Sequence, residues 1–251
     1  MSAVVQPSQA DSIQRYTRFA GIAMLLSVIF GSLGEAYLPG KIIVSGDAAA
    51  TAANIIAHPT VFRMAFATYL VEGFCDIILC VIWYIILKPV NRNLALISAF
   101  IGVVSMVTFA VAQASFWASS LIVKDIDGMS SFTAEQRNAL ALLAMRVATM
   151  IATLFIGFYG TATMIRGYLI MRSGYLPKLL GVLLIVGGAG FFLRGLTYIV
   201  APHYSSAAML FPMALAGIPL TFWLLVKGVD RKALVHCLDA DPNGLHRSTA
   251  R

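Results

Sequence analysis

Charged side chains are scarce in this sequence. Asp, Glu, Lys and Arg together make up 12% of the 251 residues, whereas 59% of the residues are hydrophobic. Because soluble domains carry about 25% charged residues, this composition excludes an ordinary soluble domain. Long apolar stretches with few charges are typical of a protein that spans a lipid bilayer. The bilayer is therefore the first partner that the sequence predicts.

Cysteine is also rare, with only Cys75, Cys80 and Cys237 in the chain. Cys75 and Cys80 are five residues apart on one expected helix, so their side chains diverge, and Cys237 lies in the C-terminal tail. We therefore expect three free thiols and no disulfide framework. The four histidines are scattered, and no group of residues has the spacing of a zinc site. The sequence predicts neither a metal nor another cofactor.

Motifs of the common catalytic and nucleotide-binding sites are missing as well. The sequence contains no nucleophile elbow, Walker loop, dinucleotide glycine fingerprint or HExxH motif. The glycine-rich run 187–190 falls within an expected helix, where it indicates close packing. No basic patch is interleaved with aromatic residues, so the net charge of +7 predicts attraction to anionic lipid headgroups and no nucleic-acid partner. Whether the protein is an enzyme stays open.

Six stretches reach the roughly 20 apolar residues that a hydrocarbon core about 30 Å thick requires. They are residues 17–38, 60–87, 93–123, 139–165, 178–201 and 205–227. The sequence therefore predicts an all-α, polytopic membrane protein with a six-helix bundle over residues 17–227. We expect a polar N-terminal segment over residues 1–16, with no signal peptide, and a largely disordered tail over residues 228–251.

Proline and glycine mark several helix ends. The segment Lys88–Asn91 contains Pro89 and predicts a tight turn between two antiparallel helices. Gly174 suits a left-handed helix cap, and Pro177 suits the first turn of the next helix. Pro212 and Pro219 both remove backbone hydrogen bonds from the last stretch, so a kink is expected there, which is either a packed bend or a hinge.

The distribution of Lys and Arg predicts the orientation. Ten of these residues fall on the side of the two termini: Arg15, Arg18, Lys88, Arg92, Arg166, Arg172, Lys178, Lys227, Arg231 and Lys232. Four fall on the other side: Lys41, Arg63, Lys124 and Arg137. The excess predicts that the N- and C-termini are both cytoplasmic.

A short helix is expected at the outer surface, over residues 45–59. Its residues Asp47, Thr51, Asn54 and His58 follow one another at steps of four, three and four, so they share one stripe. The stripe is either the solvent-exposed face of a surface helix or a polar rim over the outer mouth of the bundle.

Two carboxyl groups lie in the middle of the second apolar stretch. Glu72 and Asp76 are one helical turn apart. A charged group at bilayer depth costs roughly 2.5 to 3.5 kcal/mol even on lenient insertion scales, so both must face protein or water. Side by side they also repel each other, and we expect at least one to hold a proton near neutrality.

Other polar groups are expected at similar depth. Arg146 and Arg194 lie about 10 Å below the outer ends of their helices, and Glu35 and Gln113 also fall in the outer half. Leaving the four charges at positions 72, 76, 146 and 194 unpaired in lipid would cost about 10 to 14 kcal/mol, so we expect them to share one interior. The arginines suit a clamp on a carboxylate or a phosphate.

Small and polar residues form stripes beside these charges. Ser27, Gly31 and Glu35 follow one another at steps of four in the first stretch, and Thr68, Glu72, Asp76 and Cys80 do so in the second. Such stripes allow helices to approach closely and to pair their polar groups. They indicate either structural salt bridges that fix the register of the helices or a polar cavity that opens outward over a charged floor.

Four motifs together resemble a known family. They are SxxxGSxGExYxP at 27–39, GDAxxTAxNI at 46–55, KPVNRxLAL at 88–96 and GYLIxRSGYLPKLLG at 167–181. They are similar to a bacterial six-helix integral-membrane family that is classified only as a domain of unknown function, over roughly residues 17–201. The resemblance implies a multi-pass protein of the bacterial cytoplasmic membrane. It implies no catalytic residues.

Three functions are compatible with these features. The first is binding of a small or amphiphilic ligand in an outward-facing polar cavity, with transport or sensing as extensions. The second is an intramembrane acid/base enzyme that acts on a lipid or isoprenoid through Glu72 or Asp76. The third is an accessory subunit whose charges serve assembly. The sequence does not predict the oligomeric state.

Overall fold

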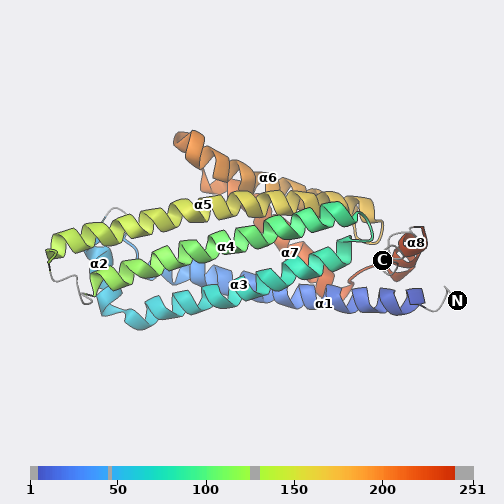
Figure 1. Cartoon of the computed structure of the whole chain (residues 1–251), viewed down its shortest axis with the longest axis horizontal. Helices are drawn as coiled ribbons and strands as arrows, with labels where there is room; N and C mark the ends of the chain where they lie inside the picture. The colour runs from blue at the N-terminus through green and yellow to red at the C-terminus, as the bar shows by residue number, and fades with distance from the viewer. Residues whose placement is uncertain (1–4, 45–46, 125–130, 241–251) are drawn as a thin grey trace, which may run out of the picture. The chain divides into compact units, whose positions relative to one another are not determined.

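The computed structural model describes residues 5–44, 47–124 and 131–240, and these residues are helical with short connections (Figure 1). In chain order the elements are α1 Val5–Gly31, a π-helix Ser32–Tyr37, a 3-10 turn Pro39–Lys41, α2 Ala48–Ala57, α3 Pro59–Leu87, α4 Arg92–Val123, α5 Ala134–Ser173, α6 Lys178–Val200, 3-10 turns Pro202–Tyr204 and Ala207–Leu210, α7 Phe211–Val226 and α8 Arg231–Ala240. Six helical segments are long and apolar enough to cross a membrane. The predicted all-α membrane fold is therefore confirmed.

Three helix boundaries differ from the sequence prediction. α1 begins at Val5, so most of the polar N-terminal segment is part of the first helix. α5 spans Ala134–Ser173 and includes Arg166, which the sequence had placed in a connection. Residues 231–240 of the expected disordered tail form α8. The part of that prediction that concerns residues 241–251 lies outside the described residues.

The chain divides into two compact units. The first unit comprises Met1–Leu25, Ile77–Ser105 and Ile156–Arg251, and the second comprises Leu26–Asp76 and Met106–Phe155. Helices α1, α3, α4 and α5 each contribute to both units, whereas α6, α7 and α8 belong to the first.

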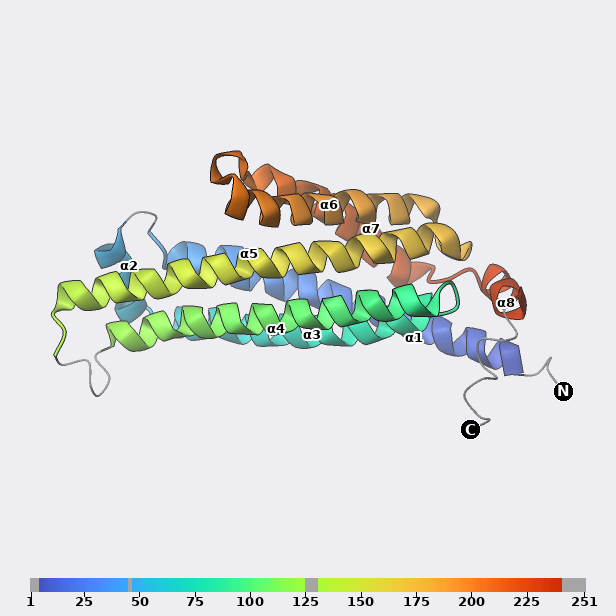
Figure 2. The ribbon, with the colours of Figure 1, turned by 45° about the horizontal axis from the view of Figure 1, so that its top comes forward.

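In the first unit, glycines bring α6 against its neighbours. A Cβ at Gly188 would lie 2.6 Å from the Gly160 carbonyl oxygen of α5, and one at Gly181 would lie 2.6 Å from the Gly167 oxygen. On the α7 side, a Cβ at Gly187 would lie 2.9 Å from the Met213 Cα. Figures 1 and 2 both show α6 and α7 running side by side. Only glycine permits helix backbones to approach this closely.

Tyr175 organises the end of the first unit where α3, α5 and α8 meet. Its hydroxyl donates to the Ile86 carbonyl at 2.6 Å, and its own carbonyl accepts from the Asp230 N–H at 2.9 Å. Burial, with a smaller contribution from Cys237, raises the pKa of this phenol, so it stays a proton donor. Leu234 of α8 is fully buried. α8 is therefore a packed part of the fold.

A second connection joins α1 to the end of α7. The Gln14 side-chain amide donates to the Lys227 carbonyl at 3.0 Å and accepts from the Val229 N–H at 2.9 Å. Between them Gly228 has φ +70°, a conformation that favours glycine. An ion pair of 2.9 Å between Asp11 and Arg231 joins α1 to α8. Figure 2 shows α8 close to the first turns of α1.

The predicted turns agree with the structure. The backbone reverses at residues 88–91 between α3 and α4, and Gly174 after α5 has φ +73°. Pro177 is the N-cap of α6. Pro212 occupies the first turn of α7, where its missing N–H costs nothing, and Pro219 alone of the two lies inside this helix.

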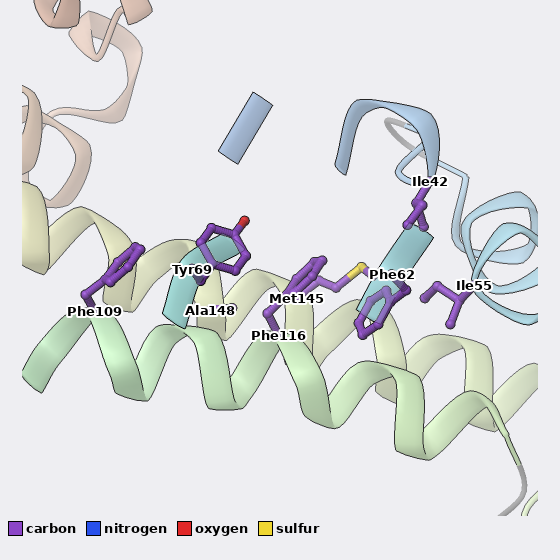
Figure 3. Close-up of a cluster of buried hydrophobic side chains, with 8 residues drawn as sticks. All are labelled: Ile42, Ile55, Phe62, Tyr69, Phe109, Phe116, Met145 and Ala148. Atoms are coloured by element: carbon purple, nitrogen blue, oxygen red, sulfur yellow. The ribbon is translucent and has the colours of Figure 1, made fainter. Parts of the chain in front are cut away.

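The second unit contains an aromatic core between α3, α4 and α5. Phe62 stacks on Phe116 with ring centroids 5.0 Å apart, and Tyr69 meets Phe109 edge-on at 5.7 Å. Met145 of α5 is buried against the same cluster (Figure 3). The cluster also includes Ile42, Ile55 and Ala148. Through Phe62 and Tyr69 the cluster packs against the first half of α3. The polar residues of the candidate site lie on the same helix.

The glycine contact between α5 and α6 gives a stability prediction. We expect Gly188→Ala to destabilise the protein by about 1 to 3 kcal/mol, because its methyl group would overlap the α5 backbone. Gly157→Ala is the matched control, since a Cβ there meets nothing within 4 Å and Ala is the better helix former. Thermal unfolding in detergent should therefore show a lower midpoint for the first variant only. Equal midpoints would mean that α5 and α6 do not approach this closely.

Candidate functional site

The polar stripes of α1 and α3 face each other in the second unit. The Ser27 hydroxyl donates to the Asp76 carboxylate at 2.8 Å. A Cβ at Gly31 would lie 2.5 Å from Oε1 of Glu72, so the carboxyl group rests against the α1 backbone. The contact follows from the four-residue steps of both stripes, because two antiparallel helices with that spacing bring successive members together.

A π-helix carries the third carboxyl group of this site. α1 widens at Ser32–Tyr37, and Glu35 is the fourth residue of that turn. π-helical turns are rare and occur frequently at functional sites. Gly34 in the same turn faces the Thr68 hydroxyl of α3, which would overlap a Cβ there. The widened turn and the close contact together place Glu35 beside α3.

Glu72 is the centre of this carboxyl cluster, which we define as Glu35, Glu72 and Asp76. Glu35 and Asp76 both lie close enough to Glu72 for charge–charge repulsion. Among the buried side-chain atoms of the described residues, Oε2 of Glu72 lacks a hydrogen-bond partner. A buried acceptor without a donor costs about 1 to 3 kcal/mol, more when it is charged. The site therefore favours whatever brings a proton or a positive charge to Glu72.

Burial changes across the cluster. Glu35 is exposed, Glu72 is half-buried and Asp76 keeps 7% of its surface exposed. Tyr69, which is buried beneath the cluster, and Cys75 are the other titratable groups near these carboxyls. The cluster is thus open at Glu35 and closed at Asp76.

The two predicted arginines occupy different places. Arg146 lies on α5 in the second unit with an exposed side chain, and within the described part of that unit it makes no ion pair with a carboxylate. Arg194 lies on α6 in the first unit, where its guanidinium donates to the Ser205 hydroxyl. That all four charges share one interior therefore stays a prediction.

Gln113 is placed inside the aromatic core of the second unit. It lies on α4 four residues after Phe109 and three before Phe116, on the face that packs against α3. Its Oε1 is buried and accepts no hydrogen bond, which makes it the second such atom among the described residues. Both of these unpaired buried atoms are acceptors, and both lie in the second unit.

The outer-rim residues mostly bind their own segment. Asp47 caps α2 by accepting from the Ala50 N–H at 2.8 Å. Thr51 is buried and accepts from the Val44 N–H at 3.0 Å, and the Asn54 amide donates to the Ile42 carbonyl at 3.1 Å. His58 is exposed at the end of α2. These contacts favour the structural interpretation of the stripe over a ligand-binding rim.

A small cavity lies next to this segment in the second unit. Its volume is about 10 Å³, room for roughly one water molecule, and it is lined by Thr51, Ala52, Ile55, Ala141, Leu142 and Met145. An organic ligand does not fit there, and the lining is almost entirely apolar. The cavity therefore does not contribute to the candidate site.

Arg166 in the first unit is a buried charge that was not expected from the sequence. Its side chain is 4% exposed; Nε donates to the Ser98 hydroxyl at 3.3 Å and Nη2 contacts the Cys80 sulfur at 3.4 Å. Gly102 is required beside it, since a Cβ there would lie 2.5 Å from Nη2. The small residues Ser98 and Gly102, one turn apart, were the available signal for a bulky side chain on the facing helix.

The carboxyl cluster can bind protons or a positively charged group. Within the described residues, no three His, Cys, Asp or Glu side chains are grouped closely enough to hold a metal ion. The Ser27 hydroxyl, which donates to Asp76, and the buried Cys75 are the groups of nucleophile type noted beside the cluster. Its chemistry is that of proton exchange and of attraction for cations.

Comparison with known proteins identifies the family. The model of a family described as a domain of unknown function, DUF4386, matches residues 19–228. The chain belongs to this family. It is also similar to an uncharacterised protein of Archaeoglobus fulgidus, with 25% identity over 157 residues, which are 61% of this chain and 76% of that protein. No solved structure matches.

The environment of Glu72 predicts the effect of neutralising it. In this DUF4386 member we expect Glu72→Gln to leave stability unchanged or to raise it at neutral pH, because it removes a repelled buried carboxyl group. A Glu72 that formed a buried salt bridge would instead lose about 3 to 5 kcal/mol on the same substitution. Thermal unfolding in lipid nanodiscs distinguishes the two cases. Glu135→Gln, at an exposed position on α5, is the control.

Proposed function

We propose that this membrane protein binds a small or amphiphilic cation at the carboxyl cluster, in exchange for protons. The observation that carries the proposal is Glu72, whose buried oxygen lacks a donor while two further carboxyl groups repel its charge. An organic ligand with a cationic N–H group would supply both the missing donor and the missing charge. Transport or sensing of that ligand would be a consequence of binding.

The charges of the second unit support a cationic ligand over an anionic one. A clamp for a carboxylate or phosphate requires guanidinium groups that converge on one point. In this unit Arg146 has an exposed side chain and makes no ion pair with a carboxylate of the described residues. The charged groups that lie near one another in this unit are the carboxyls of the cluster. An anion would add to their repulsion, whereas a cation would relieve it.

The burial gradient supports a direction of entry. Exposed Glu35 would meet the ligand first, and Glu72 would hold it above the Asp76–Ser27 pair. Tyr69 and the aromatic residues beneath it would contact the apolar part of an amphiphile and attract its charge through their ring faces. In this arrangement the binding site would open toward the end of the second unit that carries α2, in keeping with the predicted outward-facing cavity.

Proton exchange follows from the same geometry. Without ligand, the cluster lowers its repulsion by retaining protons on some of its carboxyls. A bound cation replaces those protons, so affinity should rise with pH and fall as protons compete at low pH. The carboxyl groups that would exchange protons are those of the cluster, and Tyr69 and Cys75 lie beside them.

Two probes of one shape and opposite charge test the proposal. 2-Phenylethylammonium, which carries N–H donors, and 3-phenylpropanoate, an anion of similar shape, would be titrated against the protein in nanodiscs, with equilibrium dialysis as the measurement and empty nanodiscs as the blank. We expect saturable binding of the cation only, weakened about tenfold or more by Glu72→Gln, since one charge contact at this depth is worth at least about 1.4 kcal/mol. Glu135→Gln should bind as the wild type does.

The result also separates the other functions. Equal binding of both probes, or unchanged cation binding in Glu72→Gln, would contradict the proposal. An acid/base enzyme acting on a lipid or isoprenoid would instead lose turnover in that variant while still binding its substrate. In an accessory subunit, the substitution would mainly lower the yield of the assembled complex.

We further propose that the protein lies in a bacterial cytoplasmic membrane with both termini in the cytoplasm. The basic residues near the two termini support this orientation, even with Arg166 removed from the count. A green fluorescent protein fused after Arg251 should fluoresce, and alkaline phosphatase at the same position should be inactive. The reverse pattern would place the termini outside.

A further inference from the structure

We propose that the end of the first unit formed by α5, α6 and α7 binds the headgroups of anionic glycerophospholipids. Three exposed cations surround this end: Arg172 in the last turn of α5, Lys178 at the start of α6 and Lys227 at the end of α7. We call them the basic corner. The inference is independent of the carboxyl cluster, which lies in the other unit.

The basic corner lies at the boundary between apolar and polar surface. Leu179, directly after Lys178, is 67% exposed, and Val226, directly before Lys227, is 70% exposed. Exposed apolar residues at this density contact hydrocarbon in a membrane protein, and the charge beside them marks where the headgroups begin. α6 and α7 each pass from one environment to the other within one residue of their cation.

Aromatic rings mark the same level. The Arg172 guanidinium lies over the Tyr168 ring, 6.0 Å from its centroid, and the Lys227 ammonium lies 4.5 Å from that of Trp223. Tyr and Trp concentrate at membrane–water interfaces, where one side of the ring is apolar and the other is wet. Long cations over such rings reach toward the headgroups with their stems against the apolar surface.

The charge of the basic corner is not neutralised by the protein. Within the described residues, Arg172, Lys178 and Lys227 form no ion pair with a carboxylate, whereas nearby Arg231 is paired with Asp11. Asp230, the acid closest in sequence to Lys227, uses its carboxylate to cap α8 through the Lys232 N–H at 2.9 Å. The complementary charge therefore comes from outside the described residues, and at headgroup level we take it to be a lipid phosphate.

Competition between two lipids tests the proposal. The protein would be reconstituted in nanodiscs with equal amounts of phosphatidylcholine and phosphatidylglycerol, and the lipids it retains would be counted by native mass spectrometry. A cation near the headgroups contributes about 1 kcal/mol, or roughly fivefold per contact. We expect wild-type protein to retain phosphatidylglycerol at least fivefold over phosphatidylcholine, with the preference reduced at high salt.

Two triple variants with the same change in charge locate the binding. Arg172→Gln with Lys178→Gln and Lys227→Gln should abolish the preference. The control, Lys41→Gln with Arg63→Gln and Lys124→Gln, removes three exposed cations of the second unit and should retain it. Loss of the preference in both variants, or in neither, would overturn the proposal. If the first variant does not fold, Lys178→Gln alone should reduce the preference about fivefold.

Discussion

A carboxyl group inside a bilayer must have polar neighbours, and this requirement determines how α1 meets α3 in the second unit. Water cannot solvate Asp76 at that depth, so a hydroxyl from the facing helix takes its place. One turn after Ser27, Gly31 leaves room on α1 for the Glu72 carboxyl group, since a Cβ there would lie 2.5 Å from Oε1. One hydrogen bond and one glycine thus mark where the two helices meet.

Glu72 differs from Asp76, because its buried oxygen has no hydrogen-bond donor among the described residues. The glycine that brings α1 close removes the side chain that could have donated a hydrogen bond to Glu72, and the π-helical turn adds another carboxyl group instead of a donor. Among the described residues most buried side-chain polar atoms are paired, as Gln14 is with both Lys227 and Val229, and Oε1 of Gln113 is the other exception. A local conflict of this kind is typical of a functional site. Of the two unpaired acceptors, Glu72 is the carboxyl group and lies among further carboxyls, which supports a site there.

The fold could be predicted to a large extent because a bilayer permits few solutions. Runs of about 20 apolar residues must be helices, and the signals at Asn91, Gly174 and Pro177 limit where they end. The ends that were misplaced depend on tertiary contacts. α8 exists because Leu234 is buried against the loops, and α1 continues through polar residues because Asp11 and Gln14 find partners on α7 and α8. Such tertiary contacts cannot be predicted from local hydropathy.

The candidate site was predictable only in part. Spacing identified Glu72, Asp76 and their stripes, because depth and periodicity are properties of a single helix. Spacing could not tell which way the arginines on other helices face, which is why the sequence placed Arg166 in a connection although its side chain is buried; Arg146, expected in the polar interior, has an exposed side chain. A rotation of a helix about its axis turns a side chain from the lipid-facing side to the protein-facing side. Apolar residues surround both arginines in sequence, so their helical faces gave no indication.

A purely structural role for these charges leaves the desolvation cost of Glu72 without compensation. Structural ion pairs in a membrane persist because each partner offsets the desolvation cost of the other. Within the second unit, Glu72 gains repulsion from Glu35 and Asp76 and has no cation bonded to its carboxyl group. A lone acceptor of this kind contributes nothing to register, which Ser27 and Gly31 already define. A carboxyl group that the fold does not use for its own stability remains available to bind a ligand or a proton.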